Sequence, residues 1–252
     1  MDQKFDQILP PGISIPTLAK LYSAVEIDLM RTKTSNGNSK DILAYEAIKK
    51  LFFSRKLPPG QKIIYRDLEE ALGMSKTPII SALVRLEREG LVVSKQNRGY
   101  FVRQLTAEDV RQMYDLRVRL EEIALDYALA KVAPKSLDGL KSALDAYISY
   151  NAQVYDAKLY KIDAEFHTAI ARLGGNSFLV NALEQFYLTA WLSVNVVVFT
   201  PFIDRFKADH RALYQAIKQG DRKAAKSIMR RHMRTAFSAV AASATDTVED
   251  DD

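Results

Sequence analysis

The sequence predicts a mainly α-helical protein of two domains, and three patterns along the chain support this prediction. Residues 65–90 contain two short helical patterns joined by a tight turn, and residues 91–102 contain two short apolar runs around a turn. From residue 106 onward the apolar spacing is helical throughout. This order predicts an N-terminal winged helix-turn-helix domain over residues 40–105 and a C-terminal antiparallel all-α bundle over residues 106–243.

Basic residues concentrate in the part of the chain that carries the first domain. Residues 40–103 hold 13 Lys and Arg against seven Asp and Glu, whereas residues 244–252 hold five acids and no base. The formal net charge of the whole chain is +5. A basic excess permits a nucleic-acid partner without requiring one. The acidic end is expected to be a disordered, solvated tail.

The composition excludes several classes of protein. The chain has no cysteine, which excludes disulfides and thiolate metal sites. No run of 18 apolar residues offers a membrane span, and residues 1–16 lack the basic flank and apolar core of a signal peptide. We therefore expect a soluble, cytoplasmic protein with no membrane partner. Residues 1–39 are expected to form a leader, with an amphipathic helix over 15–30 and a polar linker after it.

The first domain is expected to begin with a helix over residues 41–54. Asp67–Leu72 predicts a second helix that Gly73 ends, since glycine is common just after a helix. Ser75 is a suitable N-cap for a third helix, and Pro78 falls in its first turn, where the missing N–H costs nothing. A helix-turn-helix places its second helix in the major groove of DNA. An ordinary αα-hairpin in a helical core is the alternative for this stretch.

A β-hairpin is expected to follow these helices. Leu91–Ser94 and Tyr100–Val102 have the composition of strands, and Gln96–Gly99 has that of a turn. A helix, a helix-turn-helix and then a hairpin is the order of a winged helix, whose wing makes a second contact with DNA. Arg98 and Gly99 suit a close approach to the DNA. The hairpin therefore favours a DNA-binding domain over a simple αα-hairpin.

The second domain is expected to contain six helices. Thr106 and Asp109 resemble a capping box at the start of the first helix. Pro134 and the pair Gly174-Gly175 are expected to break the chain between later helices. The predicted helices cover residues 106–131, 136–155, 159–173, 176–199, 201–220 and 221–243. Six helices with short connections favour an antiparallel bundle.

The three histidines of the chain fall on three different predicted helices of the bundle, at His167, His210 and His232. Asp163 precedes His167 by four residues, so both side chains emerge from one helix face, one turn apart. Bundle cores commonly build metal sites from facing helices, and one carboxylate with three imidazoles suits zinc, nickel, manganese or iron. The alternatives are surface or core histidines without a metal and an Asp–His pair within one helix.

The order and spacing of residues in the first domain resemble a known family. The segment from residue 40 to residue 105 is similar to the N-terminal domain of GntR-type bacterial transcription regulators. The resemblance is carried by Leu57-Pro58-Pro59-Gly60, Leu68, Leu72-Gly73-Met74-Ser75-Lys76-Thr77-Pro78, Ala82-Leu83, Arg85-Leu86-Glu87, Glu89-Gly90-Leu91-Val92 and Arg98-Gly99-Tyr100-Phe101-Val102.

The helical half resembles the FCD effector-binding domain of the FadR-like subgroup of that family. Its marks are Leu116-Arg117, Leu120-Glu121, the segment Asp163 to His167, Asn176, Asp209-His210, Ala216-Ile217, Gly220-Asp221, Ala224-Ala225 and the segment Met229 to His232. Together the two resemblances cover nearly everything from residue 40 to about residue 240.

The resemblance implies roles for particular residues of the bundle. The family's metal ligands are matched by one aspartate and three histidines, namely Asp163, His167, His210 and His232. We expect zinc first, with nickel, manganese or iron as alternatives. Arg117 matches an arginine that faces the same cavity, where the carboxylate of a small organic acid can bind the metal and pair with the guanidinium. A salt bridge from Arg117 to a helix acid such as Glu121 is the alternative.

The resemblance also implies DNA contacts from Arg66, Lys76, Thr77, Arg98 and Gly99. The two long basic side chains of the helix-turn-helix could meet phosphates or guanine edges, and the threonine hydroxyl could donate to a phosphate. The sequence departs from the family at Ile80, where a recognition-helix arginine is usual. Isoleucine cannot hydrogen-bond a guanine but could touch a thymine methyl. The departure leaves the operator sequence open, and a different operator or a weakened DNA function are the alternatives.

These features lead us to expect a homodimeric, ligand-responsive bacterial transcription regulator that binds double-stranded operator DNA. If a small organic acid releases the protein from its operator, the protein is a repressor. An activator would use the same DNA-binding and effector-binding domains. One alternative is a metal-dependent enzyme. No histidine remains as a general base, however, and Glu165 should point away from Asp163 and His167, so we do not expect an enzyme. The other alternative is a regulator whose metal is purely structural.

Overall fold

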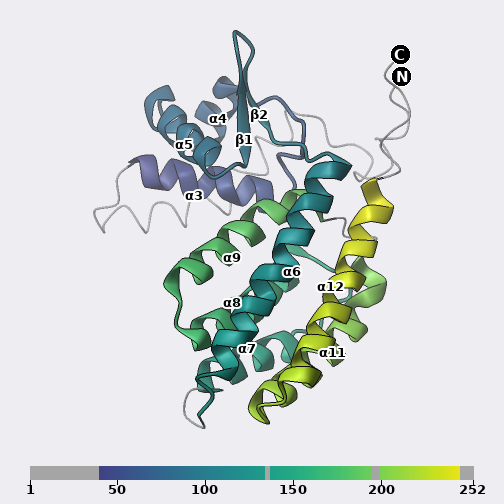
Figure 1. The fold of residues 1–252 in the computed structure, drawn as a ribbon. Coiled ribbons are helices and arrows are strands. Elements are labelled where there is room, and N and C mark those ends of the chain that lie inside the picture. Colours follow the sequence, from purple (N-terminus) through teal and green to yellow (C-terminus); the bar gives the residue numbers. More distant parts are fainter. Residues whose placement is uncertain (1–39, 134–136, 195–198, 245–252) are drawn as a thin grey trace. The chain divides into compact units, whose positions relative to one another are not determined.

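The computed structural model describes residues 40–133, 137–194 and 199–244 (Figure 1). The expected helix over 15–30, the linker after it and the acidic tail lie outside the described residues. The chain divides into two compact units between Arg103 and Gln104. The predicted fold class is confirmed, because a helix-turn-helix with a two-stranded wing precedes a helical bundle. Within the described ranges, no helix combines the length and apolar character needed to cross a membrane.

The first unit is built on two helices that pack against each other, α3 (Lys40–Phe53) and α5 (Lys76–Arg88). The shorter helix α4 (Tyr65–Leu72) also packs against α5 and turns one buried side chain, Leu68, inward. The apolar residues of α3 and α5 recur at helical spacing, so each helix presents one continuous apolar face. The core is formed by Ala44, Ile48, Leu51, Phe52, Ile79, Leu83 and Leu86.

The turn of the helix-turn-helix depends on Gly73. Its φ of +61° lies in the left-handed region, which glycine adopts without a steric penalty. The backbone N–H of Gly73 and that of Met74 both donate to the carbonyl oxygen of Glu69, which closes α4. Ser75 occupies the N-cap position of α5 as predicted, but its side chain makes no capping hydrogen bond. Pro78 lies in the first turn of α5 and is buried.

The wing consists of strands β1 (Val92–Lys95) and β2 (Gly99–Val102), paired antiparallel with Val92 opposite Val102 and Lys95 opposite Gly99. The segment around Gln61 extends this pairing, because the N–H of Val102 donates to the Gln61 carbonyl oxygen at 2.8 Å. The loop between the strands is closed by the N–H of Arg98, which donates to the Lys95 carbonyl oxygen at 2.9 Å. The hairpin is thus anchored at its base, while its loop is exposed.

The second unit contains six α-helices in the described part of the chain. They are α6 (Ala107–Leu129), α7 (Asp138–Ser149), α8 (Ala157–Gly174), α9 (Ser177–Ala190), α11 (Ile203–Lys218) and α12 (Arg222–Ala244). Helix α8 packs against α6, α7 and α9, and α12 packs against α6 and α11. The predicted capping box is present, because the Thr106 hydroxyl accepts from the Asp109 N–H while the Asp109 carboxylate accepts from the Thr106 N–H.

Two helix ends differ from the prediction. Helix α7 ends at Ser149 instead of near residue 155, because Asp156 is the N-cap of α8 and its carboxylate accepts from the Leu159 N–H. Helix α9 ends at Ala190 instead of near residue 199. A 3-10 turn over Trp191–Ser193 follows, and both Trp191 and Val194 are buried. Neighbouring side chains of an α-helix point about 100° apart, so leaving the helix allows this apolar run to reach the core.

Candidate metal centre and nucleic-acid interface

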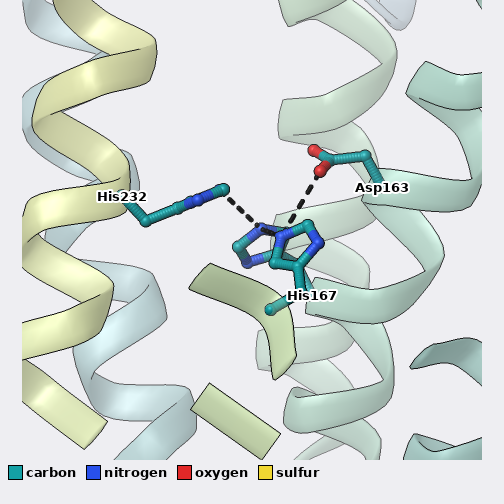
Figure 2. Close-up of side chains that lie close together, drawn as sticks. Asp163, His167 and His232 are labelled. Atoms are coloured by element: carbon teal, nitrogen blue, oxygen red, sulfur yellow. Dashed lines mark hydrogen bonds and ion pairs between the residues drawn. The ribbon is translucent and has the colours of Figure 1, made fainter. Parts of the chain in front are cut away.

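Four side chains from three helices converge in the core of the bundle. Helix α8 contributes Asp163 and His167 one turn apart, α11 contributes His210, and α12 contributes His232. Their exposed fractions are 4%, 0%, 0% and 2%, so all four are shielded from bulk water. Figure 2 shows the rings of His167 and His232 pointing toward each other across the space between their helices. The Asp163 carboxylate points into the same space. The predicted cluster is therefore brought together by the fold.

The nitrogens of the three imidazoles face one another. The Nε2 atom of His167 lies 3.3 Å from the Nε2 atom of His210 and 3.3 Å from that of His232. The Nε2 atom of His210 lies 3.5 Å from Oδ1 of Asp163. Each of the four residues offers one potential ligand atom, and these atoms lie within 4.8 Å of one another.

This donor set fits a divalent metal ion. A tetrahedral zinc ion with Zn–N bonds of about 2.0–2.1 Å would hold its nitrogens about 3.4 Å apart, close to the 3.3 Å separations of the Nε2 atoms. Two neutral imidazoles that meet through their Nε2 atoms can share one hydrogen bond if one ring donates, whereas a cation between the rings would accept a lone pair from all three. In addition, Oδ1 of Asp163 is buried and has no hydrogen-bond partner within the described structure. One cation would satisfy these atoms together.

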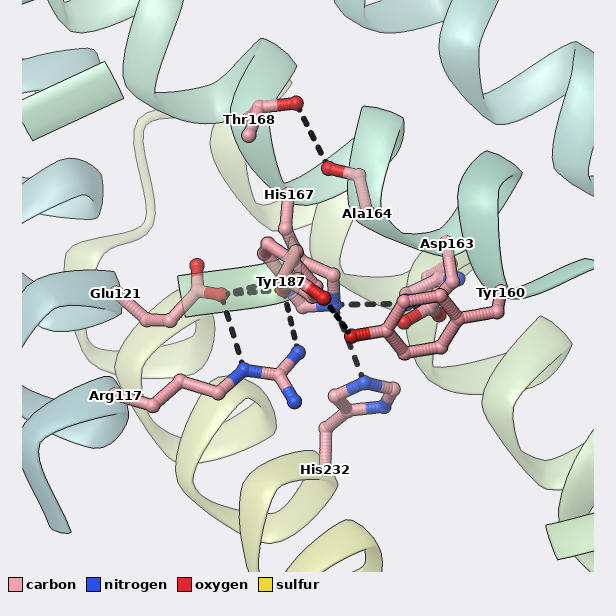
Figure 3. A network of polar contacts seen from close by, with 10 residues as sticks. Arg117, Glu121, Tyr160, Asp163, Ala164, His167, Thr168, Tyr187 and His232 are labelled. Carbon is pink, nitrogen blue, oxygen red and sulfur yellow. Dashed lines mark hydrogen bonds and ion pairs between the residues drawn. The ribbon is translucent and has the colours of Figure 1, made fainter. Parts of the chain in front are cut away.

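A buried carboxylate on α6 faces the far side of one histidine. Oε1 of Glu121 lies 3.1 Å from Nδ1 of His167, and both side chains have no exposed surface. The Tyr187 hydroxyl donates to the same oxygen at 2.8 Å (Figure 3). Burial alone would raise the pKa of Glu121, but His167 and Arg117 lower it to about 2. The ionised carboxylate lies close enough to pair with Nδ1 of His167, although this Nδ1 has no hydrogen-bond partner within the described structure. A hydrogen bond to Nδ1–H would leave Nε2 free to bind a metal.

A second carboxylate lies beside His232. Oδ2 of Asp209 lies 3.7 Å from Nδ1 of His232, and Oδ1 accepts from the Arg231 guanidinium at 2.5 Å. Burial would raise the pKa of Asp209, but its contacts with His232 and Arg231 lower it. The third imidazole, that of His210, is held by ring packing instead, with the Phe166 ring centroid 4.4 Å away.

The environment of His210 and His232 favours the neutral form of these two side chains, which is the form that binds metal. Burial lowers the pKa of His210 well below its usual range, and the charges of His232 and His167 act in the same direction. Burial likewise lowers the pKa of His232. Metal ligation requires neutral imidazoles, so both residues are ready to bind a metal at neutral pH.

Arg117 lies in the same buried region and makes two polar contacts there. Its Nε lies 3.5 Å from Oε1 of Glu121, and its Nη2 donates to the Tyr187 hydroxyl at 2.5 Å. It also lines a cavity that borders Asp163 and His232. The guanidinium is thus paired with the helix acid and, at the same time, faces the metal cluster. The cavity measures about 10 Å³, roughly the space of one water molecule.

The DNA-binding candidates lie on the surface of the first unit. Arg66 is in the first turn of α4, and Lys76 and Thr77 form the first turn of α5; all three are exposed. Arg98 is exposed in the loop of the wing, and Gly99 begins β2 with a φ of +87°, a left-handed conformation that favours glycine. The fold places these residues on the two elements that a winged helix uses for DNA.

Ile80 lies on the outer face of the recognition helix. It is 36% exposed, and it follows Lys76 by one turn of α5. Ser81, beside it, is exposed as well, whereas Ile79, Ala82 and the residues one turn later are buried. The isoleucine that departs from the family pattern therefore does not belong to the core, and it occupies a position from which a recognition helix can meet DNA.

Sequence reasoning missed the orienting carboxylates. Glu121 and Asp209 are marks of the family resemblance, and Glu121 is also a candidate partner of Arg117, but the sequence does not predict that each lies near the Nδ1 atom of a clustered histidine. Each contact joins two different helices, so the spacing of residues along the sequence does not predict it. Glu165 lies outside the cluster as expected, because its carboxylate is exposed and pairs with Arg172.

Comparison with known proteins matches both units to families. Residues 43–102 match the model described as bacterial regulatory proteins, gntR family, and residues 112–235 match the FCD domain. The chain is 26% identical over 198 residues to the uncharacterized HTH-type transcriptional regulator YdhC of Bacillus subtilis (strain 168). That match covers 75% of this chain and 85% of the relative.

Two further proteins show the extent of the similarity. A protein of Escherichia coli (strain K12) named for regulation of the L-lactate dehydrogenase operon is 23% identical over 213 residues, covering 75% of this chain and 81% of the relative. A solved GntR structure from Rhodococcus sp. RHA1 superimposes with a TM-score of 0.67 at 22% identity, covering 81% of this chain and 98% of that one. At this identity the structural likeness shows a shared fold.

Proposed function

Because the chain belongs to the GntR family of bacterial transcription regulators, in the FadR-like subgroup with a C-terminal FCD domain, we propose that it is a homodimeric repressor released from operator DNA by a small organic acid. The family is one of DNA-binding regulators and not of enzymes. A regulator that binds the chromosome acts in the cytoplasm. The observation that carries the proposal is the buried Asp and three-His cluster in the FCD domain, beside an arginine.

The DNA contacts are proposed to come from α4, α5 and the wing. Lys76 and Thr77 begin the recognition helix, so they would meet phosphates at the edge of the major groove, with Arg66 alongside. Arg98 would reach the neighbouring backbone or minor groove from the wing, and the left-handed Gly99 keeps the base of the loop free of a side chain. Ile80 would read a thymine methyl by apolar contact.

The metal is proposed to be a resident divalent ion, zinc before nickel, manganese or iron. Asp163 and the three histidines would hold it, and at least one position would remain open to an effector oxygen if the ion takes five or six ligands. The ion would supply Lewis acidity toward a carboxylate. Glu121 and Asp209 would orient His167 and His232 through their Nδ1 atoms.

The effector is proposed to be a small organic acid whose carboxylate pairs with Arg117. Because the cavity beside the metal cluster holds only about one water molecule, the aromatic side chains that line it must move when an acid enters. Arg117 would then exchange part of its contact with Tyr187 or Glu121 for the acid. That exchange gives the acid a route to alter the packing of α6 against α8 and α9. L-lactate is a reasonable first probe, because one relative is named for the L-lactate dehydrogenase operon.

Homodimerisation is proposed to use the outer face of α6. Leu116, Ile123 and Tyr127 are 53%, 45% and 44% exposed, and half-buried Met113 and Leu120 complete a stripe at the 3-4-3-4 spacing of a helix–helix seam. A row of large apolar residues on one helix face favours burial against another surface. A second copy supplies a stripe of the same kind, as twofold symmetry requires.

The dimer is tested by sedimentation velocity. Leu116→Glu combined with Ile123→Glu should convert the dimer into a folded monomer. Phe178→Glu, which changes an apolar residue that is 85% exposed on α9, should leave the dimer intact. A dimer that survives the double change would place the interface elsewhere.

DNA binding is tested by selecting bound sequences from a random duplex library with the metal-loaded protein. The selected duplex should show two related half-sites separated by about one helical turn or a multiple of it. The affinity of the protein for this duplex should fall steeply with added salt. Lys76→Ala should reduce the slope of log affinity against log salt concentration by about one. Failure to enrich any sequence, or binding that does not respond to salt, would contradict the proposal.

A further inference from the structure

A second concave surface of the FCD domain lies outside the metal cluster. It is a cleft of about 320 Å³ between α11 and α12, at the lower end of the size range of small-molecule sites. It is open to solvent, unlike the closed cavity beside Arg117. Its lining comprises Phe202, Arg205, Arg231, Arg234, Thr235 and Ser238.

The lining of the cleft is strongly basic. Three guanidinium groups come from two helices, and among the residues that the structure describes no carboxylate lines the cleft. Only Arg231 has an ion-pair partner, Asp209; within the described ranges, Arg205 and Arg234 have none. Like charges gathered in one concavity repel one another, and a bound anion relieves that repulsion.

The spacing along α12 makes the cleft a surface distinct from the metal centre. Arg234, Thr235 and Ser238 follow Arg231 by three, four and seven residues, so the four share one helix face. His232 follows Arg231 by one residue and therefore points about 100° away, into the core. Arg231 of the cleft contacts Asp209, which in turn lies beside His232, so the two sites are neighbours. Among the described residues, none that lines the cleft also belongs to the metal cluster or lines the cavity beside it.

We propose that this cleft is a second small-molecule site, which binds the phosphate group of a compact metabolite. Arginine matches a tetrahedral oxyanion because its planar fork donates to two oxygens at once. The Ser238 hydroxyl adds a neutral donor, and Phe202 offers an apolar wall for the organic part of the ligand. A concave surface suits a free phosphate compound better than the backbone of a DNA duplex, which presents a convex row of phosphates.

Inorganic phosphate is the probe that tests the proposal. Phosphorus NMR titrations at constant ionic strength should show saturable binding of phosphate to the full-length protein. Arg205→Ala combined with Arg234→Ala should weaken that binding at least about tenfold. These two arginines are chosen because Arg231 also contacts Asp209, so its removal would disturb the metal centre as well.

A control of equal charge separates the cleft from general attraction. Arg211→Ala combined with Lys223→Ala removes two exposed positive charges of α11 and α12 outside the cleft. This variant should bind phosphate as the unchanged protein does. An equal loss in both double variants, or no saturable binding in the unchanged protein, would overturn the proposal.

Two further outcomes distinguish the cleft from the sites proposed above. Phosphate binding should persist in a His210→Ala variant, because the cleft does not depend on the metal; its loss there would show that phosphate binds at the metal centre and would overturn the proposal. Arg205→Ala with Arg234→Ala should leave the affinity for the selected DNA duplex unchanged. A loss of DNA affinity as large as that caused by Lys76→Ala would identify the cleft as a DNA contact and would also overturn it.

Discussion

Replacing Glu121 with glutamine should weaken metal binding although Glu121 is not a proposed ligand. Its Oε1 lies 3.1 Å from Nδ1 of His167, and the pair is fully buried. Removing such an orienting carboxylate typically costs about 10–100-fold in metal affinity, which corresponds to roughly 1.4–2.8 kcal/mol. Glutamine retains a neutral oxygen that can accept from Nδ1–H, so we expect about tenfold for Glu121→Gln and a larger loss for Glu121→Ala.

Competition with a chromophoric zinc chelator measures this loss directly. Glu122→Gln is the matched control, because it makes the same change one residue along α6, where the carboxylate pairs with Arg230 at the surface. Circular dichroism must show that each variant keeps its helices, since Glu121→Gln also removes the charge that faces buried Arg117. Equal zinc affinity for folded Glu121→Gln and the unchanged protein would refute the orienting role of Glu121.

Three further predictions concern the same region. Replacing His210 and His232 together with alanine should abolish stoichiometric metal by elemental analysis; full metal content in the variant would exclude the four-residue site. Arg117→Lys keeps the charge opposite Glu121 but loses the planar fork, so calorimetry should show weaker binding of the organic acid and unchanged zinc affinity; unchanged acid affinity would remove Arg117 from the effector site. In metal-free protein, the pKa values of His210 and His232 in the folded state lie below the ordinary value of 6.5. Between the folded and unfolded pKa values the unfolded chain binds more protons, so the free energy of unfolding should fall as the pH is lowered from about 6.5 toward about 5. A melting temperature that rises on acidification would contradict the direction of these pKa shifts.

The candidate ligands were predictable because their pattern is local and sparse. Asp163 and His167 lie one helical turn apart, and the chain contains only three histidines. Short connections favour antiparallel packing of neighbouring helices, and such packing can bring the three helices that carry these residues together. Within the described residues, the structure gathers all four side chains.

The orienting contacts were not predictable in the same way. Glu121 meets His167 across two helices, and the contact from Asp209 to His232 likewise depends on how α11 and α12 pack. Such pairs follow from tertiary geometry, for which sequence spacing carries no signal. The two interpretations of Arg117, a salt bridge to Glu121 and a contact with the effector, also could not be separated from the sequence. The same guanidinium pairs with Glu121 and lines the cavity.

The apolar pattern of α6 was informative but incomplete. Val110, Leu116, Ile123 and Leu125 all fit a helix, yet Val110 and Leu125 are buried whereas Leu116 and Ile123 are exposed. Periodicity identifies an apolar face but does not say whether the same chain or a second copy covers it. The early end of α9 has a related cause, because the apolar run near Trp191 is buried only after the chain leaves the helix.

The affinity of the metal-loaded protein for its selected DNA duplex, with and without an organic acid, tests the central claim most directly. Fluorescence anisotropy should show that a saturating acid from a panel beginning with L-lactate weakens DNA binding by about 5–150-fold, the usual range of allosteric coupling. The response should disappear when His210 and His232 are replaced with alanine. DNA affinity that no acid changes, or an acid response that survives the loss of the metal, would contradict the account.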